Sequence, residues 1–151
     1  NDRLLAQAVT FFAAGFETTS IVMSFALYEI CLHPHIQAKV REEVKLALSQ
    51  YADITYETLQ KLKYLDMVVC ETLRKYPVVP FLDRMCIEGY KIPKSNDVIE
   101  KGTPVFISLF SLHYDPEYYP DPEKFDPKRF SESNKEKNPS CSSLQFGGGP
   151  R

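Results

Sequence analysis

The stretch FFAAGFETTSIVMSFALYEI, residues 11–30, constrains the fold more than any other part of the chain. Apolar residues recur at helical spacing through residues 3–32, which predicts one long helix. The centre of this helix nevertheless carries Gly15, Glu17 and Thr18. A mid-helix glycine costs about 1 kcal/mol relative to alanine, a threonine hydroxyl can bond back to the preceding turn, and an unpaired buried carboxylate costs more than either.

Two interpretations of this stretch stay open at this point. One is a functional site, because such residues are expected where a ligand must approach the backbone and where protons must move. The other interpretation is a kinked core helix with one surface glutamate.

The totals exclude several classes of protein. The chain of 151 residues has the size of one ordinary domain, and its 44% hydrophobic and 13% aromatic content indicates a packed globular protein. A formal charge of −2 gives no electrostatic argument for nucleic acid. Glu17 and Glu29 interrupt the longest apolar run, which argues against a membrane span, and residue 1 is Asn with no signal peptide after it. The four cysteines fit neither a zinc ribbon nor a redox pair and are expected to be free and buried: Cys31, Cys70, Cys86 and Cys141.

The pattern predicts a mainly α chain with a small β-hairpin region. Further helices are expected over about 35–49, with Pro34 at its first turn, from a Thr55 N-cap through Leu62, and over about 64–75. Residues 81–109 read as short strands with turns at Glu88-Gly89 and Lys101-Gly102. The proline-rich and aromatic-rich segment 112–130 is expected to be a packed meander without regular structure, and 131–143 a surface loop.

Two constellations carry chemistry only weakly on their own. Glu71 and Arg74 share one helix face, either as an exposed ion pair or, given their apolar neighbours, as a buried pair that needs a further partner such as Arg129. FGGGPR, residues 146–151, offers backbone that can approach a flat ligand closely, plus one cation, and lacks the Gly-Lys-Ser/Thr of a phosphate loop.

The order of these motifs is more specific than any one of them. AGFETTS, ETLR, DPKRF and FGGGPR resemble the oxygen-activating I-helix, the K-helix, the meander and the opening of the haem-binding loop in the C-terminal half of a cytochrome P-450. ALYEICLHPHIQAKVREEV, YLDMVVCETLRKYP and LHYDPEYYPDPEKFDP are most similar to microsomal enzymes of insect and vertebrate detoxification subfamilies. The resemblance implies a partial cytochrome P-450 fold.

The resemblance also implies roles for residues of the long helix. Ala14 and Gly15 would let the haem and bound oxygen come close, Thr18 would serve oxygen activation through a hydrogen bond, and Glu17 would belong to the proton-delivery route. Thr18 and Glu17 are therefore the expected catalytic residues.

Other positions follow from the same likeness. Arg84 and Arg151 would pair with haem propionates, and Phe146 would pack beside the proximal sulfur. Glu71, Arg74 and Arg129 would be structural, holding the meander against the core. The expected substrate pocket is lined by Phe12, Ala13, Val78, Val79 and Phe81.

Residues 1–151 would form a single partial domain, the C-terminal half of a catalytic domain, without the amino-terminal half, the membrane anchor or the ligand cysteine. That cysteine, the metal ligand, is expected two residues after Arg151, because Cys141 precedes the loop. Two departures from the family pattern are Lys128, where Glu is usual, and SCSSLQF, which lacks the usual aromatic and proline. The fragment alone is expected to be inactive.

The resemblance implies a haem b (iron-protoporphyrin IX) monooxygenase that inserts one atom of O₂ into a lipophilic small molecule. Electrons would come from NADPH through NADPH-cytochrome P-450 reductase, with cytochrome b5 as a further partner, on the cytosolic face of the endoplasmic reticulum membrane. One alternative is a haem-thiolate isomerase or dehydratase, against which Glu17 and Thr18 argue. Another alternative is a helical interaction module without a cofactor, which would require the motif order to be accidental.

Overall fold

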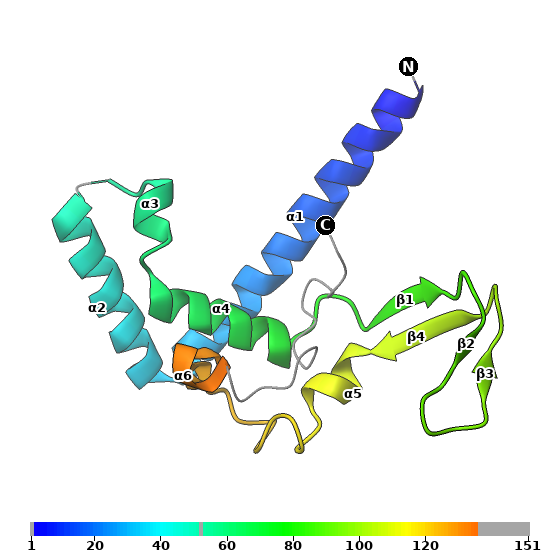
Figure 1. Cartoon of the computed structure of the whole chain (residues 1–151). Coiled ribbons are helices and arrows are strands. Elements are labelled where there is room, and N and C mark those ends of the chain that lie inside the picture. The colour runs from blue at the N-terminus through cyan, green and yellow to red at the C-terminus, as the bar shows by residue number, and fades with distance from the viewer. Residues whose placement is uncertain (1, 52, 136–151) are drawn as a thin grey trace.

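Two long helices open the chain, α1 (Asp2–Leu32) and α2 (Pro34–Tyr51), and the chain bends sharply between them (Figure 1). The computed structural model describes residues 2–51 and 53–135. Both helices were predicted, and Pro34 occupies the first position of α2 as expected, where its missing N–H leaves no carbonyl unpaired. The backbone N–H groups of Ile36 and Gln37 donate to the carbonyl of His33, so the two helices are almost continuous in sequence.

A short helix, α3 (Tyr56–Leu59), leads into α4 (Lys63–Lys75). The expected cap is confirmed, since the Thr55 side chain accepts from the backbone N–H of Thr58 at 3.3 Å. The expectation that this helix runs through Leu62 is wrong, because the bonds from Lys61 and Leu62 reach back only three residues and end it as a tight turn.

The start of α4 is held by α2. The Glu43 carboxylate accepts from the backbone N–H groups of Tyr64 at 2.7 Å and Leu65 at 2.9 Å. These N–H groups have no carbonyl partner within the helix, and a carboxylate also complements the positive end of the helix dipole. Beside this cap lies the hydrophobic core, formed by the buried Ile36, Val68 and Phe125 with the partly buried Ile30, Val40 and Tyr64.

The β region is a nested hairpin. Strand β1 (Phe81–Met85) pairs antiparallel with β4 (Pro104–Ser108), and between them β2 (Tyr90–Lys91) pairs with β3 (Val98–Ile99). Gly102, at one predicted turn, has φ of 88°, a conformation that favours glycine. The expected class, mainly α with a small β-hairpin region, is confirmed.

The segment after β4 contains more regular structure than the sequence predicted. Helix α5 (Leu109–His113) follows directly, and the meander ends in the 3₁₀ helix η1 (Pro127–Phe130) and the short helix α6 (Glu132–Lys135). The expectations of a meander without regular structure and of a surface loop from residue 131 are wrong at η1 and α6. The Asp126 side chain accepts from the N–H of Lys128 and so starts η1 despite the surrounding prolines.

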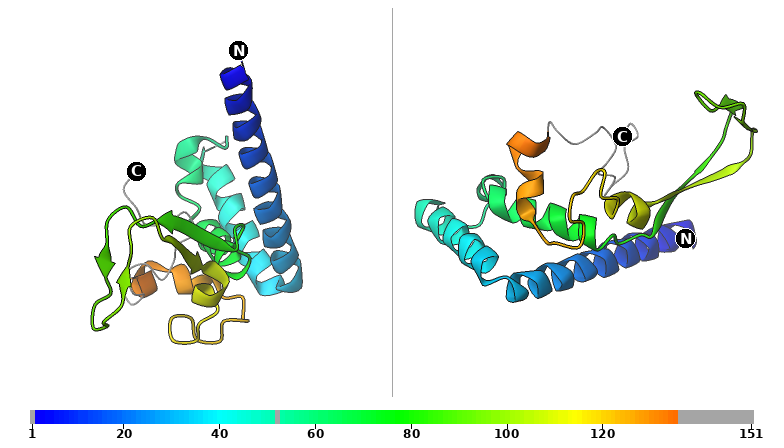
Figure 2. Two further views of the ribbon diagram at one scale, coloured as in Figure 1. Left: turned by 90° about the vertical axis from the view of Figure 1, so that its right-hand side faces the viewer. Right: turned by 90° about the horizontal axis from the view of Figure 1, so that it is seen from below.

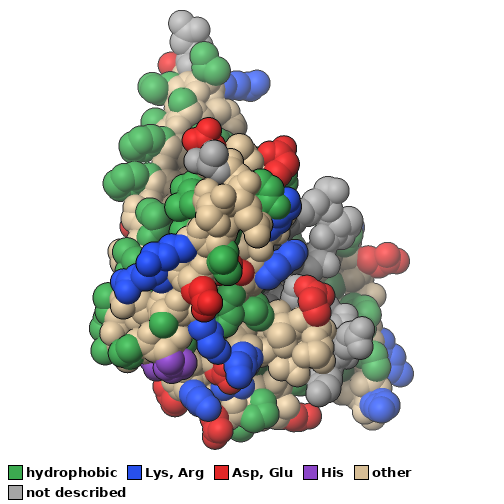
Figure 3. Space-filling model, turned by 90° about the vertical axis from the view of Figure 1, so that its left-hand side faces the viewer, with side chains coloured by type: hydrophobic (Ala, Val, Ile, Leu, Met, Phe, Trp, Pro, Cys, Tyr) green, Lys and Arg blue, Asp and Glu red, His purple; other side chains and the backbone are tan. Residues whose placement is uncertain are grey.

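The amino-terminal part of α1 projects away from the other elements (Figure 1, Figure 2). Its apolar side chains are exposed, as the green spheres along this helix in Figure 3 also show: Leu4, Leu5, Val9, Phe11, Phe12 and Phe16. By length and composition α1 would be long and apolar enough to cross a membrane, although Glu17 and Glu29 interrupt it. The expectation of buried thiols is wrong for Cys31, which is exposed near the end of α1.

The core assignment makes a prediction about stability. Replacing Ile36 with alanine in the full-length protein should lower the free energy of unfolding by about 2–5 kcal/mol, because the side chain is 1% exposed and leaves a cavity. Leu46→Ala on the exposed side of the same helix is the control and should change it by about 0.5 kcal/mol or less. Denaturant unfolding measures both, and equal effects of the two variants would contradict the assignment.

Candidate functional site

A cavity of about 500 Å³ lies between the second half of α1 and the end of α4. Its lining is mostly apolar, and Thr18, Thr19 and His113 are its polar residues. The chain after α4 also contributes, because Pro77 ends the helix and leads Val78 and Val79 along the wall. The structure thus brings together Thr18, Val78 and Val79, three residues that the sequence singled out.

The Thr18 hydroxyl bonds back into its own helix. It donates to the carbonyl oxygen of Ala14, as the hydroxyl of Thr10 does to Ala6 at 2.9 Å and that of Ser20 does to Phe16 at 2.7 Å. A hydroxyl that donates in this way keeps its oxygen lone pairs free to accept. Among these bonded hydroxyls, that of Thr18 belongs to a residue in the cavity wall.

Other predicted site residues lie outside this wall. Phe12 is exposed and stacks on Phe16 with ring centroids 5.7 Å apart, and Phe81 on β1 packs edge-on against Phe106 at 5.3 Å. Neither Glu17 nor Ala13 lines the cavity, and a Cβ added to Gly15 would meet no atom within 4 Å.

Of the residues expected to hold a cofactor, Arg84 lies on β1 and its guanidinium donates to the carbonyl of Asp83 at 2.7 Å. Ala14 shares the helix face of Thr18 without lining the cavity. Phe146 and Arg151 lie outside the described residues. The roles of these residues stay predictions.

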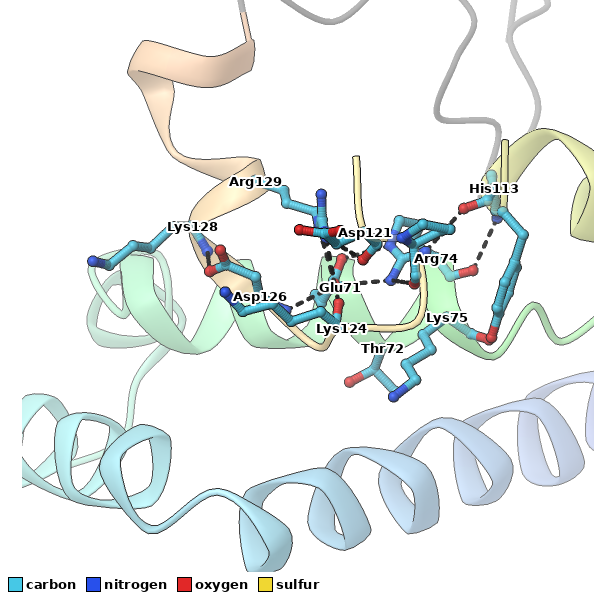
Figure 4. A network of polar contacts seen from close by, with 12 residues as sticks. Glu71, Thr72, Arg74, Lys75, His113, Asp121, Lys124, Asp126, Lys128 and Arg129 are labelled. Carbon is cyan, nitrogen blue, oxygen red and sulfur yellow. Dashed lines mark hydrogen bonds and ion pairs between the residues drawn. The ribbon is translucent and has the colours of Figure 1, made fainter. Parts of the chain in front are cut away.

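A buried ion pair lies beside the cavity on α4 (Figure 4). Arg74 donates to both carboxylate oxygens of Glu71, from Nε at 2.7 Å and from Nη2 at 2.9 Å, and both side chains are completely buried. Two parallel hydrogen bonds of this kind are the strongest geometry for a guanidinium and a carboxylate.

The remaining polar atoms of the pair are satisfied by distant segments. Arg74 also donates to the carbonyls of His113 at 2.8 Å and Pro122 at 2.9 Å. Glu71 accepts from the backbone N–H of Asp126 at 2.9 Å, and Nε of Arg129 lies 3.5 Å from its Oε1. Burial raises the pKa of the Glu71 carboxyl, and the hydrogen bonds from Arg74 oppose that rise.

His113 is a buried residue that sequence reasoning missed. It is fully buried, its Nδ1 lies 3.2 Å from the carbonyl of Arg74, and Arg74 donates in return to the carbonyl of His113. Burial lowers the pKa of His113 to about 4, so the ring is neutral at pH 7 and Nδ1 donates to the carbonyl. Its position inside an expected irregular segment gave no signal of burial.

Glu29 was also missed as a site residue. It is 1% exposed near the end of α1, and its Oε1 accepts from Nζ of Lys75 at 2.9 Å and from the hydroxyl of Tyr76. Burial and the hydrogen bond to Glu29 raise the pKa of Tyr76. The local sequence gave no signal of this burial, because the partners of Glu29 lie 46 and 47 residues further along the chain.

The whole chain, residues 1–151, matches the family model described as Cytochrome P-450. It is 52% identical over 98% of its length to cytochrome P-450 6l1 of Blattella germanica and covers 30% of that protein. It is 49% identical over 99% of its length to cytochrome P-450 6k1 of the same insect and covers 29% of it. It is also 49% identical over 99% of its length to probable cytochrome P-450 6a13 of Drosophila melanogaster, of which it covers 31%.

The buried pair makes a second prediction about stability. Glu71→Ala in the full-length protein leaves Arg74 buried without its carboxylate and should lower the free energy of unfolding by about 3–5 kcal/mol. Glu42→Ala on α2, where the carboxylate is exposed, is the control, with an expected change of about 0.5 kcal/mol or less. Denaturant unfolding would contradict the assignment if both variants kept the parent stability.

His113 predicts a pH dependence. The ordinary pKa of 6.5 applies to the unfolded chain and about 4 to the folded one, so the unfolded state binds the proton first. Stability from this residue is therefore complete above pH 6.5 and falls as the pH drops towards 4, by about 3 kcal/mol in total. His113→Asn should flatten the unfolding free energy between these pH values, because it removes the buried ring that titrates. Parallel profiles for the parent and His113→Asn would refute this.

Proposed function

We propose, since the chain belongs to the cytochrome P-450 family, that the protein containing it is a haem-dependent monooxygenase. In such a reaction a C–H bond of the substrate becomes C–OH, the second oxygen atom leaves as water, and two electrons and two protons are consumed. The observation that carries the proposal is the cavity, which places Thr18 in a mostly apolar wall. The chain spans about 30% of the length of the curated relatives it matches.

The described residues fit a haem. Its macrocycle is flat and apolar, and the cavity wall is mostly apolar side chains from α1 and from the segment after α4. Arg84, an exposed cation on β1, would pair with a propionate, together with Arg151. The haem iron, when bound, supplies the oxygen chemistry, and we place its thiolate ligand in the residues that follow FGGGPR.

Within this chain, Thr18 is proposed to transfer protons at the cavity wall. Its hydroxyl donates to the Ala14 carbonyl, so its oxygen can accept a proton donor from the cavity side while the helix holds it in place. To pass on its own proton as it accepts another, the hydroxyl would leave the Ala14 carbonyl and turn its O–H towards the cavity, and it would return to the carbonyl afterwards. Glu17, the neighbouring acid in sequence, is the proposed source that replenishes these protons.

The same cavity wall would also contact the substrate. Val78 and Val79 offer it branched apolar surface without hydrogen-bonding groups, which suits a lipophilic small molecule. We place Phe12, Ala13 and Phe81 in further parts of the pocket. The proposed partners are NADPH-cytochrome P-450 reductase as electron donor, with cytochrome b5 as an accessory one, at the endoplasmic reticulum membrane.

The proposal predicts the phenotype of Thr18→Ala in the full-length enzyme. Haem should be retained, because the residue packs in the wall without holding the fold together. Product formation should fall by about tenfold or more, and the reductant consumed should appear as peroxide, because the proton supply at this point is lost. NADPH use, peroxide and product are measured together.

Thr10→Ala is a matched control on the same helix. Thr10 makes the same bond to its own helix but is exposed and does not line the cavity, so this variant should couple NADPH use to product normally. If Thr18→Ala also stayed fully coupled, the proposed role of the hydroxyl would be wrong.

A further inference from the structure

One line of side chains on α1 faces α4. Thr18, Val22, Phe25 and Glu29 follow one another at about one helical turn each, so they share one face. Thr18 and Val22 line the cavity, while Phe25 stacks on the ring of Tyr76 with centroids 4.2 Å apart and planes 6° apart. The cavity and the contact between the helices are therefore successive parts of one face.

Glu29 closes this face with directional bonds. Its Oε1 receives two hydrogen bonds from consecutive residues at the end of α4, from Lys75 at 2.9 Å and from the Tyr76 hydroxyl. Its Oε2 lies 3.3 Å from Nδ1 of His33. Apolar contact is non-directional and lets a helix turn, but a buried carboxylate held by two donors fixes its angle.

Tyr76 does not line the cavity itself, but it directly precedes residues that do. The residues that follow it, Pro77, Val78 and Val79, line the cavity together with Thr18. Tyr76 thus contacts α1 through Phe25 and Glu29, and the residues directly after it form part of the cavity wall to which Thr18 also belongs.

We propose that Glu29, gripped by Tyr76, is the positioning residue for Thr18. The hydrogen bonds from Lys75 and Tyr76 to Glu29, called the clamp below, fix the rotation of α1 about its axis. Thr18 is thereby held in the cavity wall beside Val78 and Val79. A turn of α1 by one residue position would carry Thr18 about 100° away from this wall. The inference rests on the proposed function for its catalytic consequence, whereas its structural part stands on the contacts alone.

Tyr76→Phe in the full-length enzyme is the cleanest test. The substitution keeps the ring that stacks on Phe25 and removes the hydroxyl that holds Glu29. The ratio of peroxide to product should rise about fivefold, because the net free energy of one hydrogen bond corresponds to about a fivefold change in an equilibrium constant. Glu29→Gln, which keeps an acceptor oxygen, should show a smaller rise in the same direction. Tyr56→Phe, which removes an exposed hydroxyl on α3, is the control and should show none.

A positioning role differs from a general structural one in the double variant. If Tyr76 acts through Thr18, then Tyr76→Phe should add nothing to the peroxide ratio once Thr18→Ala is present. Multiplicative effects of the two substitutions would overturn the proposal.

A second readout does not depend on turnover. Met23 lines the cavity from α1, whereas Met85, at the end of β1, is exposed and does not line it. With ¹³C-methyl-labelled methionine, Tyr76→Phe should shift or broaden the Met23 methyl resonance and leave that of Met85 unchanged. An unchanged Met23 signal would refute the clamp. If the Met23 signal moves but Thr18→Ala itself stays coupled, the clamp stands and the proposed catalytic role of Thr18 fails.

Discussion

The buried pair of Glu71 and Arg74 is the interaction on which the rest of this structure depends. Removing two charges from water is expensive, and their mutual attraction offsets the penalty only when every remaining donor and acceptor is satisfied. Here the missing partners are backbone groups of segments far along the chain, the carbonyls of His113 and Pro122 and the N–H of Asp126. The chain can therefore bury the pair only by bringing α5 and the meander onto α4 (Figure 4).

The cavity inherits its shape from that requirement. Once α4 is fixed, so is the residue at its end, Tyr76, and from it the segment that forms one wall. Glu29 then attaches α1 to this fixed point, near the end of α1, while the amino-terminal part of the helix projects away from the other described elements (Figure 2). The catalytic proposal for Thr18 thus depends on two successive acidic anchors, one in α4 and one in α1.

The sequence predicted what local periodicity and local chemistry determine. Helices α1 to α4, the Thr55 cap and the presence of a small β-hairpin region follow from residues close in sequence, so they were found with small errors at the ends, whereas the nesting of the two hairpins was not predicted. The burial of His113 and Glu29 could not be found in this way, because it depends on contacts with α4 that are remote in sequence. The helix η1 was missed because the four prolines near it outweighed the capping side chain of Asp126.

The geometry of α1 places the site residues that were predicted on this helix on different faces. Ala14 and Val22, one turn before and after Thr18, share its face, whereas Phe12 lies about 120° round the helix and Glu17 about 100°. A single rigid helix cannot present all of these side chains to one narrow cavity, and the described cavity includes Thr18 but neither Phe12 nor Glu17. A proton from Glu17 would have to reach Thr18 around the helix, through water or through a change of side-chain rotamer. The hydroxyl, held by the Ala14 carbonyl, is then the fixed end of that route and the acid its mobile end.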